Sequence, residues 1–446
     1  MLALRADLLD FPAPPPWADP ADDAPGVRWR PGHWLVVGDD GRIAAVHGPG
    51  WTPPPGSTVE DHAGRLLLPG FIDTHVHSAQ MEVVASYGTE LLDWLQRYTF
   101  PAERAFADAG YATAAAERFV GALLAHGTTT AVVFPTVHKT SIDALFAAAH
   151  DRGMRLVAGK VLMDRHAPDG LRDDVTQAER DCIDLIDRWH GTGRLAFAVT
   201  VRFAPTSTPA QLAMAGALCR ADPTLYMQTH VAENRDEVRW VAELFPQARS
   251  YLDVYDAVGL LHPRAVLAHG IWLDDADRAV LAERGAQVAH CPLSNQFLGS
   301  GLLDWPRLRA AGVAVSLASD VGGGTHLAMP RTLASAYQVQ ALGGHRLTAW
   351  CALHAATAGA AAALRLDGEI GTLDPGRHAD LTLWDWARGP LDGRRMEVVQ
   401  GLHERVFAWM SLADERHLAA TWVAGRLQHR RSDPWPPLRA PGPPAP

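Results

Sequence analysis

Two histidines, His75 and His77, stand two residues apart in the segment GFIDTHVH. On an extended strand alternate side chains point to the same side, so both imidazoles would face one way. Two imidazoles held together suit a metal ion. For an isolated H-x-H pair, a role as hydrogen-bonded core histidines is about equally frequent. The residues elsewhere in the sequence therefore have to distinguish a metal site from a pair of core histidines.

Three more candidate ligands end apolar segments that predict strands: His230 in LYMQTHVAE, His269 in RAVLAHG and Asp320 in AVSLASD. If these strands are parallel neighbours, the four imidazoles and the carboxylate meet at one mouth. Nitrogen and oxygen ligands without a thiolate match a catalytic site for Zn²⁺ or Fe²⁺ that keeps one position open for water. Such an ion lowers the pKa of the water to about 7, which makes hydroxide available.

Glu233 lies three residues after His230, where a carboxylate can reach a substrate without binding the metal. A lone surface glutamate is usually a solvated charge, but the position beside a strand-end histidine favours a proton shuttle. Asp73 shares a face with the two histidines and lies deeper, so we expect it to accept hydrogen bonds from loop amides. His126 and His290 are interpreted as supporting or packed polar groups. Trp94 is the only tryptophan near the expected site, and the sequence assigns it no role.

Eight apolar segments alternate with Ala-rich helical stretches, as expected for a (β/α)8 TIM barrel of the α/β class. Helices are predicted at 108–126 and 274–284, where apolar residues recur at helical spacing. The expected strands are GFIDTHVH, GTTTAVVF, RLVAGKVLM, LAFAVTVRF, LYMQTHVAE, RAVLAHG, AQVAHCP and AVSLASD.

Short strands with Gly and Pro turns mark both ends of the chain, beginning with a hairpin at VRWRPGHWLVVGDDGRIAAVHG. We expect the two ends to pair into a small β-sandwich domain. The predicted boundaries are 1–68 for its first part, 69–369 for the barrel, 370–432 for its second part and 433–446 for a Pro-rich disordered tail.

Composition excludes several classes of function. A net charge of −10 without a Lys/Arg cluster gives no footprint for nucleic acid. No stretch reaches the about 20 apolar residues that a membrane span needs, and the start resembles no secretory signal. The four cysteines are far apart and form no C-x-x-C pair, which predicts buried, reduced thiols. We expect a cytoplasmic enzyme with a small-molecule substrate.

Taken together, PGFIDTHVH, THVAE, LAHG, HCPLSN, SLASD and GTLDPGRHADL resemble the metal-dependent amidohydrolase superfamily over nearly the whole chain. The resemblance implies that His269 holds the attacking water or the substrate and that Glu233 moves the proton. It also implies catalytic roles for Asp320 and His269 and one Zn²⁺ per chain, with Fe²⁺ as the alternative. The implied metal ligands are His75, His77, His230 and Asp320.

Four narrower segments, HSAQ, LLDWLQRYTFPAE, VLMDRHAPDGL and VRFAPTST, resemble the guanine deaminases within that superfamily. By this resemblance the enzyme hydrolyses guanine to xanthine and ammonia in purine catabolism, and acts as a homodimer. The residues that would contact the purine are Gln80, Arg202, Phe203, His230 and Glu233.

The sequence argues against three other interpretations. A deaminase of another aminated ring on the same fold, acting on 8-oxoguanine, a pterin, a triazine or an adenosine derivative, is opposed by Gln80, Arg202 and LLDWLQRYTFPAE. A non-catalytic barrel predicts missing ligands, and none is missing. The unrelated deaminase fold is excluded because its P-C-x-x-C motif does not occur. No residue is placed to bridge a second metal, Lys160 on the third strand being the only conceivable one.

Overall fold

The computed structural model describes residues 1–87 and 91–432. Its larger part is a barrel of parallel strands, and each of the eight segments expected from the sequence forms strand structure. The barrel strands are β5 (Phe71–His77), β6 (Thr128–Phe134), β7 (Arg155–Ala158) with β8 (Val161–Leu162), β9 (Leu195–Val201), β10 (Tyr226–Val231), β11 (Ala265–His269), β12 (Gln287–His290) and β13 (Ala314–Leu317).

The two ends of this sheet, β5 and β13, are brought together by the segments at their mouths. The amide of Asp320 donates to the carbonyl of His75 at 2.9 Å, and the amide of His77 donates to the carbonyl of Val321 at 2.7 Å. Deeper in the seam, the hydroxyls of Thr74 and Ser316 lie 2.8 Å apart. These contacts close the ring, so the first and last barrel strands deliver their side chains to one mouth.

The third barrel strand is interrupted, which the sequence did not indicate. RLVAGKVLM divides into β7 and β8 at Gly159 and Lys160. The Gly159 backbone approaches β9 so closely that a Cβ atom there would lie 1.8 Å from the Ala198 carbonyl oxygen. Lys160 turns to Asp173, with which it forms a buried ion pair. Only glycine fits this approach, and the strand resumes after it.

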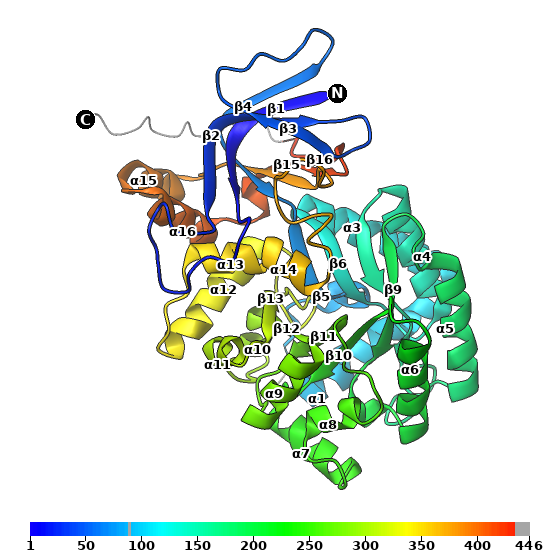
Figure 1. Cartoon of the computed structure of the whole chain (residues 1–446). Coiled ribbons are helices and arrows are strands. Elements are labelled where there is room, and N and C mark those ends of the chain that lie inside the picture. Colours follow the sequence, from blue (N-terminus) through cyan, green and yellow to red (C-terminus); the bar gives the residue numbers. More distant parts are fainter. Residues whose placement is uncertain (88–90, 433–446) are drawn as a thin grey trace.

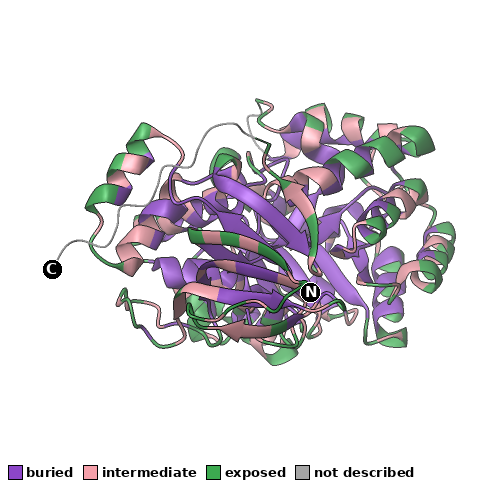
Figure 2. Cartoon of the chain, turned by 90° about the horizontal axis from the view of Figure 1, so that it is seen from above, coloured by how far each residue is buried: buried purple, intermediate pink, exposed green. Residues whose placement is uncertain are grey.

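Helices cover the outside of the barrel, and Figure 2 shows buried strands at the centre with exposed residues on the outer helix faces. The two predicted helices are confirmed: Asp108 caps the first and Asp274 caps the second, each by accepting a backbone N–H. The helices of the barrel region are α1 (Leu91–Trp94), α2 (Phe100–Arg104), α3 (Ala109–Ala125), α4 (Lys139–Asp151), α5 (Val175–Trp189), α6 (Pro209–Ala221), α7 (Arg235–Leu244), α8 (Tyr251–Asp256), α9 (Asp275–Arg284), α10 (Pro292–Phe297), α11 (Trp305–Ala310), α12 (Met329–Leu342), α13 (Ala349–Ala355) and α14 (Ala358–Ala363).

Strands from both ends of the chain form a second sheet above the barrel in Figure 1, as expected. The predicted β-sandwich takes the form of one continuous seven-stranded sheet in the order β16-β15-β14-β4-β1-β2-β3. Its strands are β1 (Leu2–Asp10), β2 (Arg28–Val37), β3 (Ile43–His47), β4 (Thr58–Pro69), β14 (Leu381–Trp384), β15 (Leu418–Val423) and β16 (Arg426–Arg430). The predicted hairpin is the antiparallel pair β2 and β3. Helices α15 (Pro390–Val398) and α16 (Leu402–Leu412) lie beside the sheet.

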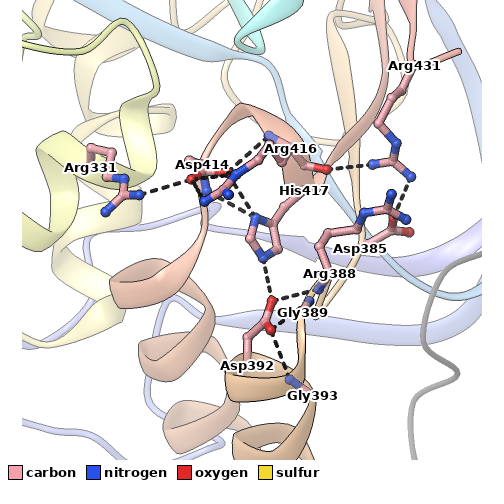
Figure 3. A network of polar contacts seen from close by, with 10 residues as sticks. All are labelled: Arg331, Asp385, Arg388, Gly389, Asp392, Gly393, Asp414, Arg416, His417 and Arg431. Carbon is pink, nitrogen blue, oxygen red and sulfur yellow. Dashed lines mark hydrogen bonds and ion pairs between the residues drawn. The ribbon is translucent and has the colours of Figure 1, made fainter. Parts of the chain in front are cut away.

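A polar network fastens the second sheet to the barrel helices (Figure 3). Asp414 accepts a hydrogen bond at 2.9 Å from Arg331 of α12 and also binds Arg416. His417 lies 2.8 Å from Asp392 at the start of α15. Burial acts to raise the pKa of the buried Asp414 carboxyl, but hydrogen bonds and charge from Arg416, together with the hydrogen bond from Arg331, hold it well below its usual range. The network therefore keeps Asp414 ionised and the two parts of the chain in contact.

All four cysteines are buried and free, as predicted. Among the described residues, no helix is both long and apolar enough to cross a membrane. The predicted tail at 433–446 lies outside the described residues, and the other three predicted domain boundaries stay predictions.

Candidate active site

Five predicted side chains meet at the carboxyl end of the barrel strands. His77 Nε2 lies 3.2 Å from Nε2 of both His75 and His230, and 3.3 Å from Asp320 Oδ1. A set of four ligand atoms also lies within 4.8 Å of one another, one atom from each of His75, His230, His269 and Asp320. The convergence expected from strand-end positions is therefore present, with separations short enough for a single ion to lie among the donors.

The backbone that carries these groups is held in uncommon conformations. His269 has φ of 73° and Asp320 has φ of 48°, a region that side chains other than glycine rarely adopt. Asp73 supports the Asp320 segment, because its Oδ1 accepts from the Ser319 amide at 3.0 Å and its other oxygen binds the Ser319 hydroxyl. The predicted role of Asp73 as a partner of loop amides is confirmed. Strain at such positions is typical of functional sites.

His230 and His269 differ in the hydrogen bonds that their Nδ1 atoms form. His230 Nδ1 lies 2.6 Å from the Arg202 carbonyl oxygen, so it donates there and leaves the Nε2 lone pair for a ligand. His269 Nδ1 accepts from the amide nitrogen of Asn295 at 2.8 Å. In this arrangement His269 Nε2 carries the proton and faces Glu233 Oε2 at 3.4 Å. His269 Nε2 is therefore placed to donate a hydrogen bond, whereas His230 Nε2 is placed to bind a metal.

Burial and neighbouring charges set the protonation of the cluster. Desolvation lowers the pKa of His77 to about 4 and that of His269 to about 3, and it holds the pKa of His230 well below its usual value. Burial alone would raise the pKa of Asp320, but the charge and hydrogen bond of His75 and the neighbouring histidines lower it well below its usual range. Neutral imidazoles beside an ionised carboxylate form the donor set that a divalent metal binds.

Glu233 is buried beside the cluster and is held at several points. Ser300 donates to its Oε1 at 2.8 Å, and its backbone amide donates to Glu237 Oε2 at 2.9 Å. Burial, together with the charges of Asp320 and Glu237, raises the pKa of Glu233 well above its usual value. A carboxyl group that retains its proton near neutral pH can act as a general acid.

The cluster opens into a narrow pocket. Most predicted site residues contribute to its wall, and His75, which does not, is in ring contact with His77. The wall is formed by His77, Gln80, Leu91, Trp94, Leu95, Arg202, Phe203, His230, Glu233, Glu237, His269, Leu298, Asp320 and Gly323.

Arg202 and Gln80 are joined in this wall by Glu103 of α2, a residue that the sequence did not single out. Arg202 Nη1 lies 2.7 Å from each Glu103 oxygen, and both side chains are buried. Gln80 Nε2 donates to Glu103 Oε1 at 3.4 Å. Glu103 lies within the quoted segment LLDWLQRYTFPAE, which was the only signal that could have led to it.

Residues that were discounted do lie apart from the cluster. Lys160 is paired with Asp173. His126 binds the carbonyl of its own helix at Ala122, and His290 is buried against Trp305. Residues that the sequence missed are Glu103, Glu237, Asn295 and Ser300.

The comparisons with known proteins agree with this geometry. The model of the Amidohydrolase family matches residues 66–427. The chain is 44% identical to the guanine deaminase of Escherichia coli strain K12 over 374 residues, which are 84% of this chain and 85% of that protein.

Two solved structures are similar over almost their whole length. One is an E. coli guanine deaminase, with a TM-score of 0.91, 38% identity and coverage of 97% of this chain and 99% of that one. The other is the guanine deaminase of C. acetobutylicum with guanine bound in its active site, with a TM-score of 0.84, 26% identity and coverage of 96% and 99%.

Proposed function

The chain belongs to the amidohydrolase family and, within it, to the guanine deaminases, and from this premise we propose that it hydrolyses guanine to xanthine and ammonia. The C2–N bond of the exocyclic amine breaks, and a bond from C2 to the oxygen of water forms. The observation that carries the proposal is the position of Glu233, a buried carboxyl group 3.4 Å from His269 in the pocket that Arg202 also lines.

The donor set fits one divalent metal ion, held by His75, His77, His230 and Asp320. Their Nε2 and Oδ1 atoms face one another, and the carboxylate is ionised while His77 and His230 are neutral. Zn²⁺ suits three imidazoles and one carboxylate, and Fe²⁺ is the alternative. When bound, the ion supplies hydroxide near neutral pH.

The residues of the chain move the protons. Glu233 donates a proton to the ring nitrogen beside C2, which makes the carbon more electrophilic and later lets the amine leave as ammonia. Asp320 receives the proton of the attacking water and passes it to the departing amine. His269, whose protonated Nε2 lies 3.8 Å from Asp320 Oδ2, donates a hydrogen bond to the attacking oxygen. A general acid or base positioned in this way contributes about 10²- to 10⁴-fold to the rate.

The wall of the pocket recognises the ring. Arg202 donates to O6 of guanine, Phe203 packs on the purine face, and Gln80 contacts its edge. Glu103 engages Nη1 of Arg202, so Nη2 is left to face a ligand. Adenine carries an amino group in place of O6, and its donors would meet the guanidinium donors.

The test is ammonia release from the metal-replete enzyme with a panel of aminated purines, pterins and triazines. Guanine is expected to be the preferred substrate and xanthine the product, read from its absorbance. Ammonia release from a pterin, a triazine or an adenosine derivative at a rate above that with guanine would contradict the proposal. The homodimer stays a prediction, which light scattering of the purified enzyme tests.

A further inference from the structure

Trp94 contributes an unusual polar atom to the pocket. The residue ends helix α1, lines the pocket and is 2% exposed. Its indole Nε1 is buried and has no hydrogen-bond partner among the described residues. Tryptophan can only donate, and leaving a buried donor unpaired is costly. A buried N–H in the wall of a substrate pocket therefore calls for an acceptor on the ligand.

Four other buried indole N–H groups also lack a conventional partner, but each has a different environment. Trp34, Trp384, Trp386 and Trp409 each meet another aromatic ring edge to face, where a π face can receive an N–H weakly. Among the described residues, Trp94 has no such aromatic contact. It is also the only one of the five that lines the pocket.

The pocket wall combines polar and apolar side chains. The polar ones include the histidine and carboxylate cluster with Glu233, and among the described residues no ring contact joins a histidine of this cluster to the Trp94 indole. The apolar lining side chains all belong to one packed cluster, and the Trp94 N–H is the only side-chain hydrogen-bonding group among them. These side chains are Leu91, Trp94, Leu95, Phe203 and Leu298.

The proposed reaction orients guanine in the pocket. C2 must face the histidine cluster, and the five-membered ring lies at the other end of the purine. That ring carries one nitrogen without hydrogen, an acceptor, in either tautomer of the free base. We propose that Trp94 Nε1 donates a hydrogen bond to this imidazole nitrogen and so determines specificity at the end of the substrate remote from the reaction. The inference rests on the proposed function, because it uses guanine as the ligand.

The experiment compares guanine with 7-deazaguanine, which has the same shape and whose five-membered ring lacks an acceptor. The unmodified enzyme should prefer guanine by about 10- to 100-fold in kcat/KM, the cost of an unpaired buried donor. Trp94→Phe keeps the aromatic ring and removes the N–H. The variant should lower kcat/KM for guanine by about the same factor. Its kcat/KM for 7-deazaguanine should stay within about threefold of the value for the unmodified enzyme, so the preference for guanine disappears.

Trp386→Phe is the matched control, since it removes another buried indole N–H outside the site, and it should retain the preference. Metal content and Tm of each variant are measured beside the kinetics. If Trp94→Phe fails to fold, benzothienylalanine at position 94 replaces the N–H by sulfur in the same shape.

Equal losses on both substrates would show that the indole acts by packing and would overturn the inference, as would an intact preference in Trp94→Phe. An unmodified enzyme that does not turn over guanine would instead overturn the proposed function, and this inference with it.

Discussion

Glu103 and Arg202 form a buried ion pair in which both carboxylate oxygens lie 2.7 Å from one guanidinium nitrogen. Arg202 is 3% exposed and Glu103 is fully buried. The arginine also stacks on Phe100, with Cζ 5.1 Å from the ring centroid. Arg202, which we assign to substrate recognition, is thus held in place before substrate binds. An experiment therefore has to distinguish its role in the ion pair from its role in binding substrate.

Replacing Arg202 by Met should lower kcat/KM for guanine by about 10²- to 10⁴-fold, because a charged donor to O6 is lost. Metal content should not change. The variant also leaves the buried Glu103 carboxylate without its cation, which destabilises the fold. The double variant Arg202→Met/Glu103→Gln removes that charge and should recover Tm but not activity. A folded, metal-replete Arg202→Met enzyme with the parental rate would show that Arg202 serves the ion pair alone.

Glu233→Gln keeps the side-chain size but removes its ability to transfer a proton, so kcat should fall by about two orders of magnitude or more. Metal content, measured by elemental analysis, should stay at the parental value. Glu243→Gln, which changes an exposed glutamate near the end of helix α7, is the control and should keep full activity. If Glu233→Gln loses its metal along with its activity, Glu233 is a ligand.

We expect one metal ion per chain, because the described residues around the cluster include no side chain that bridges to a second ion. Lys160, the one conceivable bridge, is buried against Asp173. Chelation should abolish guanine turnover and lower Tm, and one equivalent of Zn²⁺ should restore both. Two tightly bound ions per active subunit would contradict the ligand assignment and bring Lys160 into the site.

His354 should make stability depend on pH. Burial, and then the nearby Arg309 cation, lower its pKa to about 4, below the ordinary value of about 6.5. Between about pH 6.5 and 4 the unfolded chain therefore binds a proton at His354 that the folded chain does not bind. This contribution is present in full above about pH 6.5 and is lost as the pH falls towards 4, by up to about 3 kcal/mol less the part that solvent screens.

The measurement is the midpoint of urea unfolding between pH 4 and 8. His354→Gln should flatten its decline below pH 6.5, whereas replacing the exposed His326 by Gln should leave the curve unchanged. Parallel curves for His354→Gln and the unmodified chain would assign the pH dependence to other groups.

The barrel and its metal cluster could be predicted because both follow from local pattern. Apolar segments mark the strands, and polar residues at strand ends such as His230 and Asp320 must meet at one mouth. The break at Gly159 could not be seen, because it depends on the approach of the Ala198 carbonyl from another strand. Glu103 was missed for the same reason. Its helix has no distinguishing period, and its role exists only through contact with Arg202.

The seam between β5 and β13 has a consequence for biosynthesis. His75 and His77 emerge early from the ribosome, and Asp320 emerges only after nearly the whole barrel has been made. A nascent chain therefore carries three of the four proposed ligands, His75, His77 and His230, until its last barrel strand docks and Asp320 completes the set. By the proposed ligand assignment the metal site is complete only when the ring is closed, so we expect a barrel without its last strand to bind metal weakly and to be inactive.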